Sequence, residues 1–198
     1  ELRGFVPSRL EQCRVGSSLA GLPLTCHTLV TFYNRNAFRR AGVDVPATVH
    51  DTWTTEDFAA TAKKLKDRGG MKYGWAAAHD DEVLYAVDRM FGGPAGIAWF
   101  ISQHTEGIAP RVTWMAHGPD AASMLLRGQC GMLIDWSSRG RQFEEQIRSF
   151  SWDVTYLPRD ERPMAAITGD NWAVFSTNKT EDTIQLLRAI TSANIMNH

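Results

Sequence analysis

The chain has 198 residues, of which 43% are hydrophobic and 22% are charged. This composition is that of an ordinary globular protein and excludes a disordered or fibrous one. The formal net charge is −1 at pH 7, with acidic and basic residues scattered along the chain. A protein that holds nucleic acid needs a clustered basic face, so we expect no nucleic-acid partner. No stretch approaches the 18 consecutive apolar residues of a membrane-spanning helix.

The chain starts at Glu1, without a methionine and without the basic and apolar segments of a signal peptide. A processed or excised chain starts in this way. We therefore expect any signal peptide to lie outside this sequence.

The three cysteines, Cys13, Cys26 and Cys130, lack the Cys-x-x-Cys spacing of zinc sites and thioredoxin-like pairs. We expect no metal ligand and no cofactor. Two interpretations of the cysteines stay open. One is a disulfide, for instance between Cys13 and Cys26, with one buried thiol, and the other is three buried reduced cysteines.

The first half of the chain alternates strand and helix patterns. Residues 29–33 are rich in β-branched and aromatic types, which predicts a buried strand. A short helix is expected next, capped by Asn36 and ended by Gly42. A capping-box-like start at 54–57 predicts a second helix, whose inward positions follow helical spacing: Phe58, Ala62 and Leu65.

A second strand is predicted at 73–78, and a third helix is predicted to run to the glycine pair at 92–93. The inner stripe of that helix consists of three apolar residues: Val83, Val87 and Met90. The sequence therefore predicts strands separated by amphipathic helices.

The second half repeats the alternation. A helix is expected to start at Pro119 and to end before Gly128, followed by a short apolar strand at 130–134. Another helix is predicted at 139–150. A short apolar strand is then expected at 172–176.

The last predicted helix has Asn178 and Glu181 as reciprocal caps. Its inner stripe consists of three apolar residues: Ile184, Leu187 and Ile190. Strands that alternate with helices of this length indicate an α/β fold, with helices packed on a sheet.

Several stretches, taken in order, resemble family 1 extracellular solute-binding proteins, the group that includes maltose-binding protein. Residues 21–65 contain Gly-Leu-Pro, then Tyr-Asn-x-x-x-Phe-x-x-Ala-Gly, then Thr-Trp and Glu-Asp-Phe. Residues 73–93 are similar to the family's strand, cleft loop and helix ending in Gly-Gly. The remaining matches are 124–143, 152–158 and 169–192. Their collinear order makes the resemblance specific.

The resemblance implies a periplasmic-binding-protein-like two-lobed fold. Family members are much longer than this chain, so one lobe is expected to be near complete and the other partial. Residues 1–34 and 154–198 are assigned to partial lobe one, and residues 35–153 to most of lobe two.

The same resemblance implies the receptor component of an ABC importer, which binds a sugar or oligosaccharide in a cleft between lobes without catalysing a reaction. Such a receptor is expected to be a monomer that works with the permease subunits of its transporter. It is expected outside the cytoplasm, in the periplasm or anchored to the cell surface.

Trp136 is the first candidate for a ligand-binding residue. A sugar has hydroxyl groups and C–H faces, so its receptor needs planar aromatic rings as well as carboxylates or amides. Trp136 directly follows a predicted strand end, where a cleft opens in α/β sheets. The alternative is a core Trp between strand and helix.

Acidic residues form a second candidate group. Asp80, Asp81 and Glu82 lie between a predicted strand and a helix, so their carboxylates are suited to accept hydrogen bonds from hydroxyls. Simple capping of the helix explains one acid. The number of acids in one turn favours at least one directed to the cleft.

The remaining candidates come from lobe one. Thr25 and His27 precede the first predicted strand, and the resemblance implies that the turn Gly169, Asp170, Asn171 and Trp172 lines the cleft. For Trp172, burial in the core is an equal alternative. Trp53 matches a family Trp with a structural role.

Two alternative functions stay open, a glycoside hydrolase and a binding protein for a non-sugar solute. Paired carboxylates among aromatics also describe a glycoside hydrolase, but these acids come from one turn, whereas hydrolytic carboxylates face each other across the bond. The sequence has no motif of common catalytic sites, so no catalytic residue is expected. A non-sugar solute such as ferric iron is the other alternative, although no Tyr pair accompanies the acids.

Overall fold

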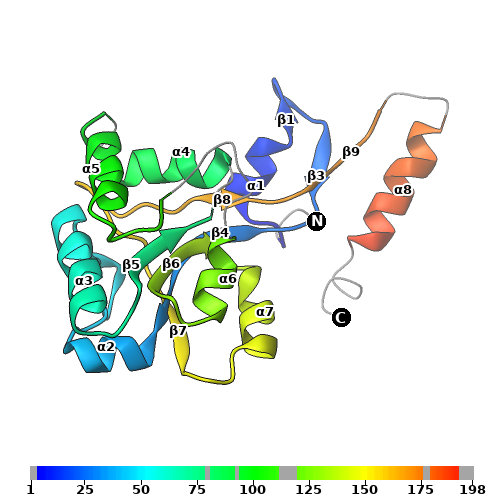
Figure 1. The fold of residues 1–198 in the computed structure, drawn as a ribbon. Helices are drawn as coiled ribbons and strands as arrows, with labels where there is room; N and C mark the ends of the chain where they lie inside the picture. The colour runs from blue at the N-terminus through cyan, green and yellow to red at the C-terminus, as the bar shows by residue number, and fades with distance from the viewer. Residues whose placement is uncertain (1–3, 79–80, 92–93, 112–119, 176–178, 192–198) are drawn as a thin grey trace. The chain divides into compact units, whose positions relative to one another are not determined.

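The computed structural model describes residues 4–78, 81–91, 94–111, 120–175 and 179–191 (Figure 1). The chain divides into two units. Unit 1 is Glu1–Thr28 with Ile167–His198, and unit 2 is Leu29–Ala166. Among the described residues, no helix has both the length and the apolar character needed to cross a bilayer.

Unit 2 is built on a sheet with strand order β5-β6-β4-β7. β5 runs parallel to β6, whereas β4 is antiparallel to both β6 and β7. The elements in chain order are β4 (His27–Asn34), α2 (Arg35–Ala41), a 3-10 turn (Val49–Asp51), α3 (Thr55–Asp67), β5 (Tyr73–Ala77), α4 (Asp81–Met90), α5 (Pro94–Thr105), α6 (Ala121–Leu126), β6 (Cys130–Trp136), α7 (Arg139–Gln146) and β7 (Trp152–Thr155).

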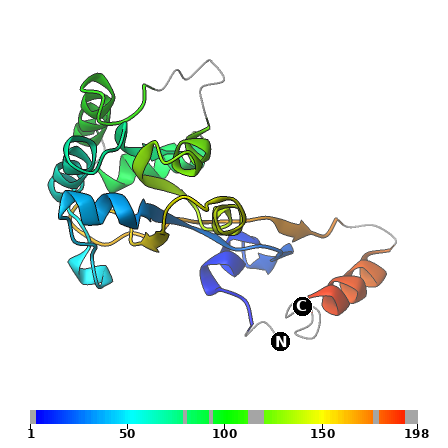
Figure 2. The same ribbon diagram turned by 60° about the horizontal axis from the view of Figure 1, so that its bottom comes forward.

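Both faces of this sheet are covered along β5 and β6, because successive residues of a strand point to opposite faces and each face has a helical cover, whereas the edge strand β7 stays partly exposed. Trp75 and Met132 belong to the first core cluster, which also contains residues of α2, α3 and α4. Ala76 and Leu133, the next residues along the strands, belong to the second core cluster with residues of α6 and α7. Figure 2 shows these elements in a second view.

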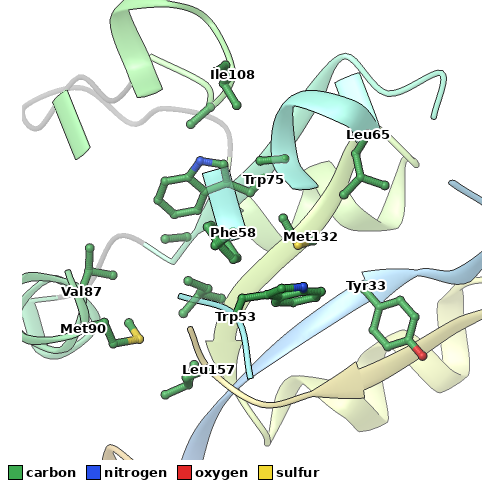
Figure 3. Close-up of a cluster of buried hydrophobic side chains, with 14 of the residues drawn as sticks. Tyr33, Trp53, Phe58, Leu65, Trp75, Val87, Met90, Ile108, Met132 and Leu157 are labelled. Carbon is green, nitrogen blue, oxygen red and sulfur yellow. The ribbon is translucent and has the colours of Figure 1, made fainter. Parts of the chain in front are cut away.

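Phe58 lies at the centre of the first core cluster and has no exposed surface (Figure 3). Its ring centroid is 5.3 Å from that of Trp75, 6.0 Å from that of Trp53 and 5.9 Å from that of Phe91. Trp53 is 7% exposed in the same cluster, so its structural role is confirmed.

The start of α2 differs from the expected one. Asn34, rather than Asn36, is the cap, and its side chain accepts a hydrogen bond from the Ala37 N–H at 3.0 Å. The backbone of Asn34 is still extended, as a cap requires, whereas Asn36 already lies inside the helix. Gly42 ends the helix in the left-handed conformation, as predicted.

The capping box of α3 is confirmed. The Thr54 hydroxyl accepts a hydrogen bond from the Asp57 N–H at 3.2 Å, and the Asp57 carboxylate accepts one from the Thr54 N–H at 3.3 Å. Two backbone donors of the first turn are thereby satisfied.

Two later elements are shorter than expected. The helix predicted at 139–150 ends at Gln146, because Ile147 takes an extended conformation and packs into the second core cluster. The strand predicted at 172–176 is β9 (Asn171–Ala173), and residue 176 lies outside the described residues. Helix α5 was not predicted, because its apolar residues lie all round the helix and give no one-sided stripe.

Unit 1 contains short elements: α1 (Pro7–Gln12), β1 (Arg14–Val15), β2 (Ser18–Leu19), β3 (Gly21–Pro23), β8 (Ile167–Thr168), β9 (Asn171–Ala173) and α8 (Thr180–Ile190). β1 pairs with β2, β3 pairs with β9, and β8 pairs with His27 and Thr28 at the start of β4. Of the stripe predicted for the last helix, Leu187 is buried. The expected helix start at Pro119 and the expected cap Asn178 lie outside the described residues.

The boundaries of the two units do not coincide with the lobe ranges drawn from the sequence. The boundary falls inside β4, after Thr28, because residues 29–33 pair with β6 and residues 31–34 pair with β7. Residues 154–166 likewise belong to unit 2. The assignment of residues 1–34 and 154–198 to one lobe and 35–153 to the other stays a prediction for the protein at its natural full length.

All three cysteines are free thiols, so the Cys13–Cys26 disulfide is not formed. Three buried cysteines are not found either, because Cys26 is exposed, while Cys13 and Cys130 are buried. Burial raises the pKa of the Cys130 thiol to about 12. This thiol therefore stays protonated at neutral pH.

Gly74 is required by the close approach of α3 to β5. A Cβ atom at this position would lie 2.1 Å from the Ala62 carbonyl oxygen. We expect Gly74→Ala to lower the free energy of unfolding by about 1 to 3 kcal/mol, because α3 has to move away from the sheet. Gly140→Ala in α7 is the matched control, since its nearest contact would be an ordinary 3.9 Å. Urea denaturation measures both, and equal midpoints for the two variants would contradict the prediction.

Candidate functional site

The carboxyl ends of β5 and β6 meet at one edge of the sheet in unit 2. Ala77 pairs with Ile134, and the Ala78 N–H donates to the Ile134 carbonyl at 3.0 Å. β6 ends at Trp136, and α4 begins at Asp81, three residues after Ala78. Because parallel strands carry their following loops at the same edge, the start of α4 and Trp136 belong to one end of the sheet.

Trp136 is half-buried at this edge. Its backbone pairs with Leu29 of β4, and its side chain packs against the first core cluster while part of it stays exposed. An aromatic ring supported by a core on one side is suited to present a flat apolar surface on the other. Neither a fully buried nor a fully exposed Trp has this property.

Asp135 supports the strand end beneath Trp136 and was missed by the sequence reasoning. It is 1% exposed, and its Oδ1 accepts a hydrogen bond from the Trp136 N–H at 2.7 Å. Its Oδ2 forms an ion pair with Arg139 Nε at 3.6 Å. A buried carboxylate needs such partners, and this one ties the end of β6 to the first turn of α7. The signal available in the sequence was the acid at the end of an apolar strand with an Arg four residues later.

In unit 1, Thr25 and the turn 169–171 are brought together although 145 residues separate Thr25 from Asp170. The Asp170 N–H donates to the Thr25 hydroxyl at 2.8 Å, and the Leu24 N–H donates to the Asp170 carbonyl at 2.9 Å. Gly169 has φ +153°, and a Cβ there would lie 2.2 Å from the Thr25 carbonyl oxygen. Only glycine fits this close approach.

Arg9, on α1, binds the same turn through hydrogen bonds, and the sequence reasoning missed it as well. It is 2% exposed and donates to the Asp170 carbonyl at 3.1 Å and to Asn171 Oδ1 at 2.8 Å. It also donates to the side chain of Gln12. Nothing in the sequence separates this Arg from the many surface arginines, because its acceptors lie far away in the chain.

The other candidates of unit 1 adjoin these residues in the chain, since His27 follows Thr25 by two positions and Trp172 follows Asn171 directly. His27 is half-buried and pairs with Thr168. Trp172 pairs with Leu22 across the β3–β9 sheet and is 40% exposed, so unit 1 does not bury it as a core residue.

Asp80 lies outside the described residues, and the structure places only the backbones of Asp81 and Glu82, in the first turn of α4. Their contribution to ligand binding stays a prediction. Within the part of the chain that the structure describes, no three His, Cys, Asp or Glu side chains gather as a metal site would require.

The chain is similar to several known proteins. A protein from Brucella abortus strain 2308, named as a binding protein, is 22% identical over 206 residues. The match covers 92% of this chain and 49% of the relative, so the chain spans about half the length of the curated relative.

Solved structures show the same fold. The ABC substrate-binding protein Lmo0181 from Listeria monocytogenes, in complex with cycloalternan, has a TM-score of 0.77 at 17% identity, over 98% of this chain and 53% of that chain. T. maritima MalE3 with bound maltose has a TM-score of 0.75 at 19% identity, over 98% and 56%. UgpB from Mycobacterium tuberculosis with glycerophosphocholine has a TM-score of 0.76 at 17% identity, over 98% and 55%.

These likenesses confirm the predicted α/β fold of the periplasmic-binding-protein type, with partial lobes. The sequence model of one family matches residues 2–193, which is nearly the whole chain. The chain therefore belongs to the bacterial extracellular solute-binding proteins, the family to which its sequence motifs pointed.

Proposed function

We propose that the protein at its natural full length is the receptor of an ABC importer and binds a sugar or oligosaccharide without catalysing a reaction. Membership of the solute-binding family supports the receptor role, and the maltose complex of a protein with the same fold supports the ligand class. The importer's permease subunits are the proposed protein partners. We further propose that the receptor acts as a monomer outside the cytoplasm, in the periplasm or anchored to the cell surface.

The observation that carries the sugar proposal is the half-buried Trp136 at the end of β6. Its ring is supported by the first core cluster, and Asp135 fixes the backbone beneath it. A ring held in this way loses little conformational freedom on binding, and its exposed part is suited to the C–H face of a pyranose. The acids of the preceding βα turn, Asp80, Asp81 and Glu82, are the proposed acceptors for hydroxyls at this edge.

The groups proposed for hydroxyl binding in unit 1 are polar and small. Thr25, Asp170 and Asn171 combine a hydroxyl, a carboxylate and an amide. This set offers both donors and acceptors, which suits sugar hydroxyls because each can donate one hydrogen bond and accept two. His27, Gly169 and Trp172 are proposed to complete it.

A second candidate ligand is a non-sugar polyol derivative. UgpB, which has the same fold, was solved with glycerophosphocholine, so this fold is not restricted to sugars. Trp136 and the polar groups above favour a sugar over such a ligand, and a direct comparison of the two tests this preference.

A thermal-shift screen of the protein at its natural full length tests the proposal. The panel contains mono-, di- and oligosaccharides and glycerophosphocholine, with amino acids, polyamines and ferric iron as controls. A ligand at about 100 times its Kd stabilises the folded state by about 2.7 kcal/mol, so one sugar class is expected to raise the Tm clearly.

The same mixtures are then analysed for reducing ends. Unchanged sugar together with a raised Tm is the expected result. New reducing ends would show a hydrolase, and a Tm raised only by a control solute or by glycerophosphocholine would replace the sugar proposal.

A further inference from the structure

The guanidinium of Arg9 is buried against neutral oxygen atoms. Arg9 is 2% exposed, and its described partners are the Gln12 side chain, the Asp170 carbonyl and the amide oxygen of Asn171. Removing a cation from water is costly unless its donors are satisfied. The helix α1, of six residues, therefore carries a buried cation whose described hydrogen bonds go from Nη1 and Nη2 to uncharged oxygen atoms.

Two of these contacts go to the turn 169–171, whose last residue, Asn171, is also the first residue of β9. The same nitrogen, Arg9 Nη2, donates to the Asp170 carbonyl at 3.1 Å and to Asn171 Oδ1 at 2.8 Å. The Asp170 carbonyl also accepts from Leu24 N at 2.9 Å, and Asp170 N donates to the Thr25 hydroxyl. Arg9 thus completes a network that fixes both the backbone of the turn and one of its side chains.

The contact with Arg9 fixes the orientation of the Asn171 side-chain amide. A guanidinium has donors and no acceptor, so the Asn171 amide has to turn its oxygen toward Arg9. The amide nitrogen, which carries two donors, then points away from Arg9. The side chain of Asn171 is exposed on unit 1, so these donors lie at its surface, next in the chain to the exposed carboxylate of Asp170.

We propose that Arg9 is a positioning residue for ligand binding. It holds the turn 169–171 and sets Asn171 to donate a hydrogen bond to a solute hydroxyl, beside an Asp170 carboxylate that accepts one. This inference rests on the proposed function, because it assigns the turn a sugar ligand. Arg9 itself does not touch the ligand.

Asn171→Asp keeps the hydrogen bond from Arg9 but removes the N–H donors proposed to bind the ligand. The introduced carboxylate still accepts from Arg9, so the denaturant midpoint is expected to stay at or above that of the natural protein. It has no donor, so the affinity for the sugar found by the thermal-shift screen is expected to fall about tenfold. Arg9→Met removes all donors while keeping the apolar stem, and a loss of affinity of about tenfold or more is expected. Arg9→Lys is expected to restore part of it.

Arg14→Met is the matched control, because Arg14 follows α1 but is exposed, and its partners among the described residues are local, Glu11 at 3.0 Å and Ser17. Its affinity is expected to equal that of the natural protein. Calorimetry on the protein at its natural full length measures all four variants. Unchanged affinity in Asn171→Asp would overturn the donor role, whether or not Arg9→Met folds.

Hydrogen exchange separates this inference from the sugar proposal. Exchange at the Asp170 N–H, which donates to the Thr25 hydroxyl, is expected to become faster in Arg9→Met with no ligand present. Unchanged exchange would overturn the positioning role. If the natural protein binds no sugar but exchange responds to Arg9, the proposed function fails and the positioning role stands.

Discussion

Phe58→Ala is expected to lower the free energy of unfolding by about 3 to 5 kcal/mol. Phe58 has no exposed surface, and the aromatic rings of Trp53, Trp75 and Phe91 surround it within 6.0 Å. Truncation leaves a cavity that the rigid neighbouring rings fill poorly. The loss of stability is therefore the sum of the lost transfer free energy of the ring and the cost of the cavity. This is the largest stability effect that we expect from one substitution in unit 2.

Urea denaturation followed by circular dichroism measures the effect, with Ile101→Ala as the control. Ile101 lies on α5 and is 55% exposed, so its truncation is expected to change the free energy of unfolding by less than about 0.5 kcal/mol. A similar small loss in Phe58→Ala would show that the ring cluster is not the main core of the unit.

The sequence predicted most of unit 2 because local signals and tertiary packing agree there. The capping box at Thr54 and Asp57, the left-handed Gly42 and the apolar strand at 130–134 each form as expected. In each case a short motif satisfies backbone groups locally, and the adjacent apolar residues are buried in the same arrangement.

The errors arise where tertiary contacts override local preference. Residues 147–150 have a helix-compatible sequence, but Ile147 leaves the helix to enter the second core cluster. Helix α5 was not predicted because apolar residues occur on both its buried and its exposed sides. Trp99 and Phe100 pack against the first core cluster, whereas Ile97 and Ile101 are exposed. A one-sided stripe is then absent from the sequence.

Fewer residues of the candidate site could be predicted from the sequence, because more of them depend on tertiary contacts. Trp136 could be proposed from its place after a strand, and Thr25 and Asp170 from the family resemblance. Arg9 could not, because its role depends on hydrogen bonds to residues more than 160 positions away. Asp135 had a local signal in the Arg four residues later, but its burial beneath Trp136 depends on the packed sheet. A buried polar group whose partners lie far away in the chain carries no signature of its own in one sequence.

Trp152 is the natural comparison for Trp136 as a proposed sugar platform. Both are half-buried tryptophans that pack against a core cluster. Trp136 pairs with Leu29 of β4, whereas Trp152 pairs with Asn34, five residues further along the same strand. That separation is about 17 Å in an extended strand, so the two rings serve different ends of the sheet.

Trp136→Ala in the protein at its natural full length is expected to weaken sugar binding on the order of 10 to 100-fold. The flat apolar surface under the sugar is lost, and burial of an aromatic face contributes roughly 1.5 to 3 kcal/mol at about 25 cal/mol per Å². The stability loss is expected to stay below the roughly 3 to 5 kcal/mol of a fully buried Trp, because only part of the side chain packs on the core. Trp136→Phe is expected to keep part of the affinity. Trp152→Ala is expected to show the reverse pattern, with lower stability and unchanged affinity.

Calorimetry and urea denaturation on the same three variants separate the two interpretations of Trp136. A platform predicts that affinity falls in Trp136→Ala, recovers in part in Trp136→Phe and does not change in Trp152→Ala. A core residue predicts that the denaturation midpoint of Trp136→Ala collapses while the remaining folded protein binds sugar normally. In that case Trp136 supports the end of β6 from within, and the sugar platform has to be sought among the other residues of the edge that β5 and β6 share.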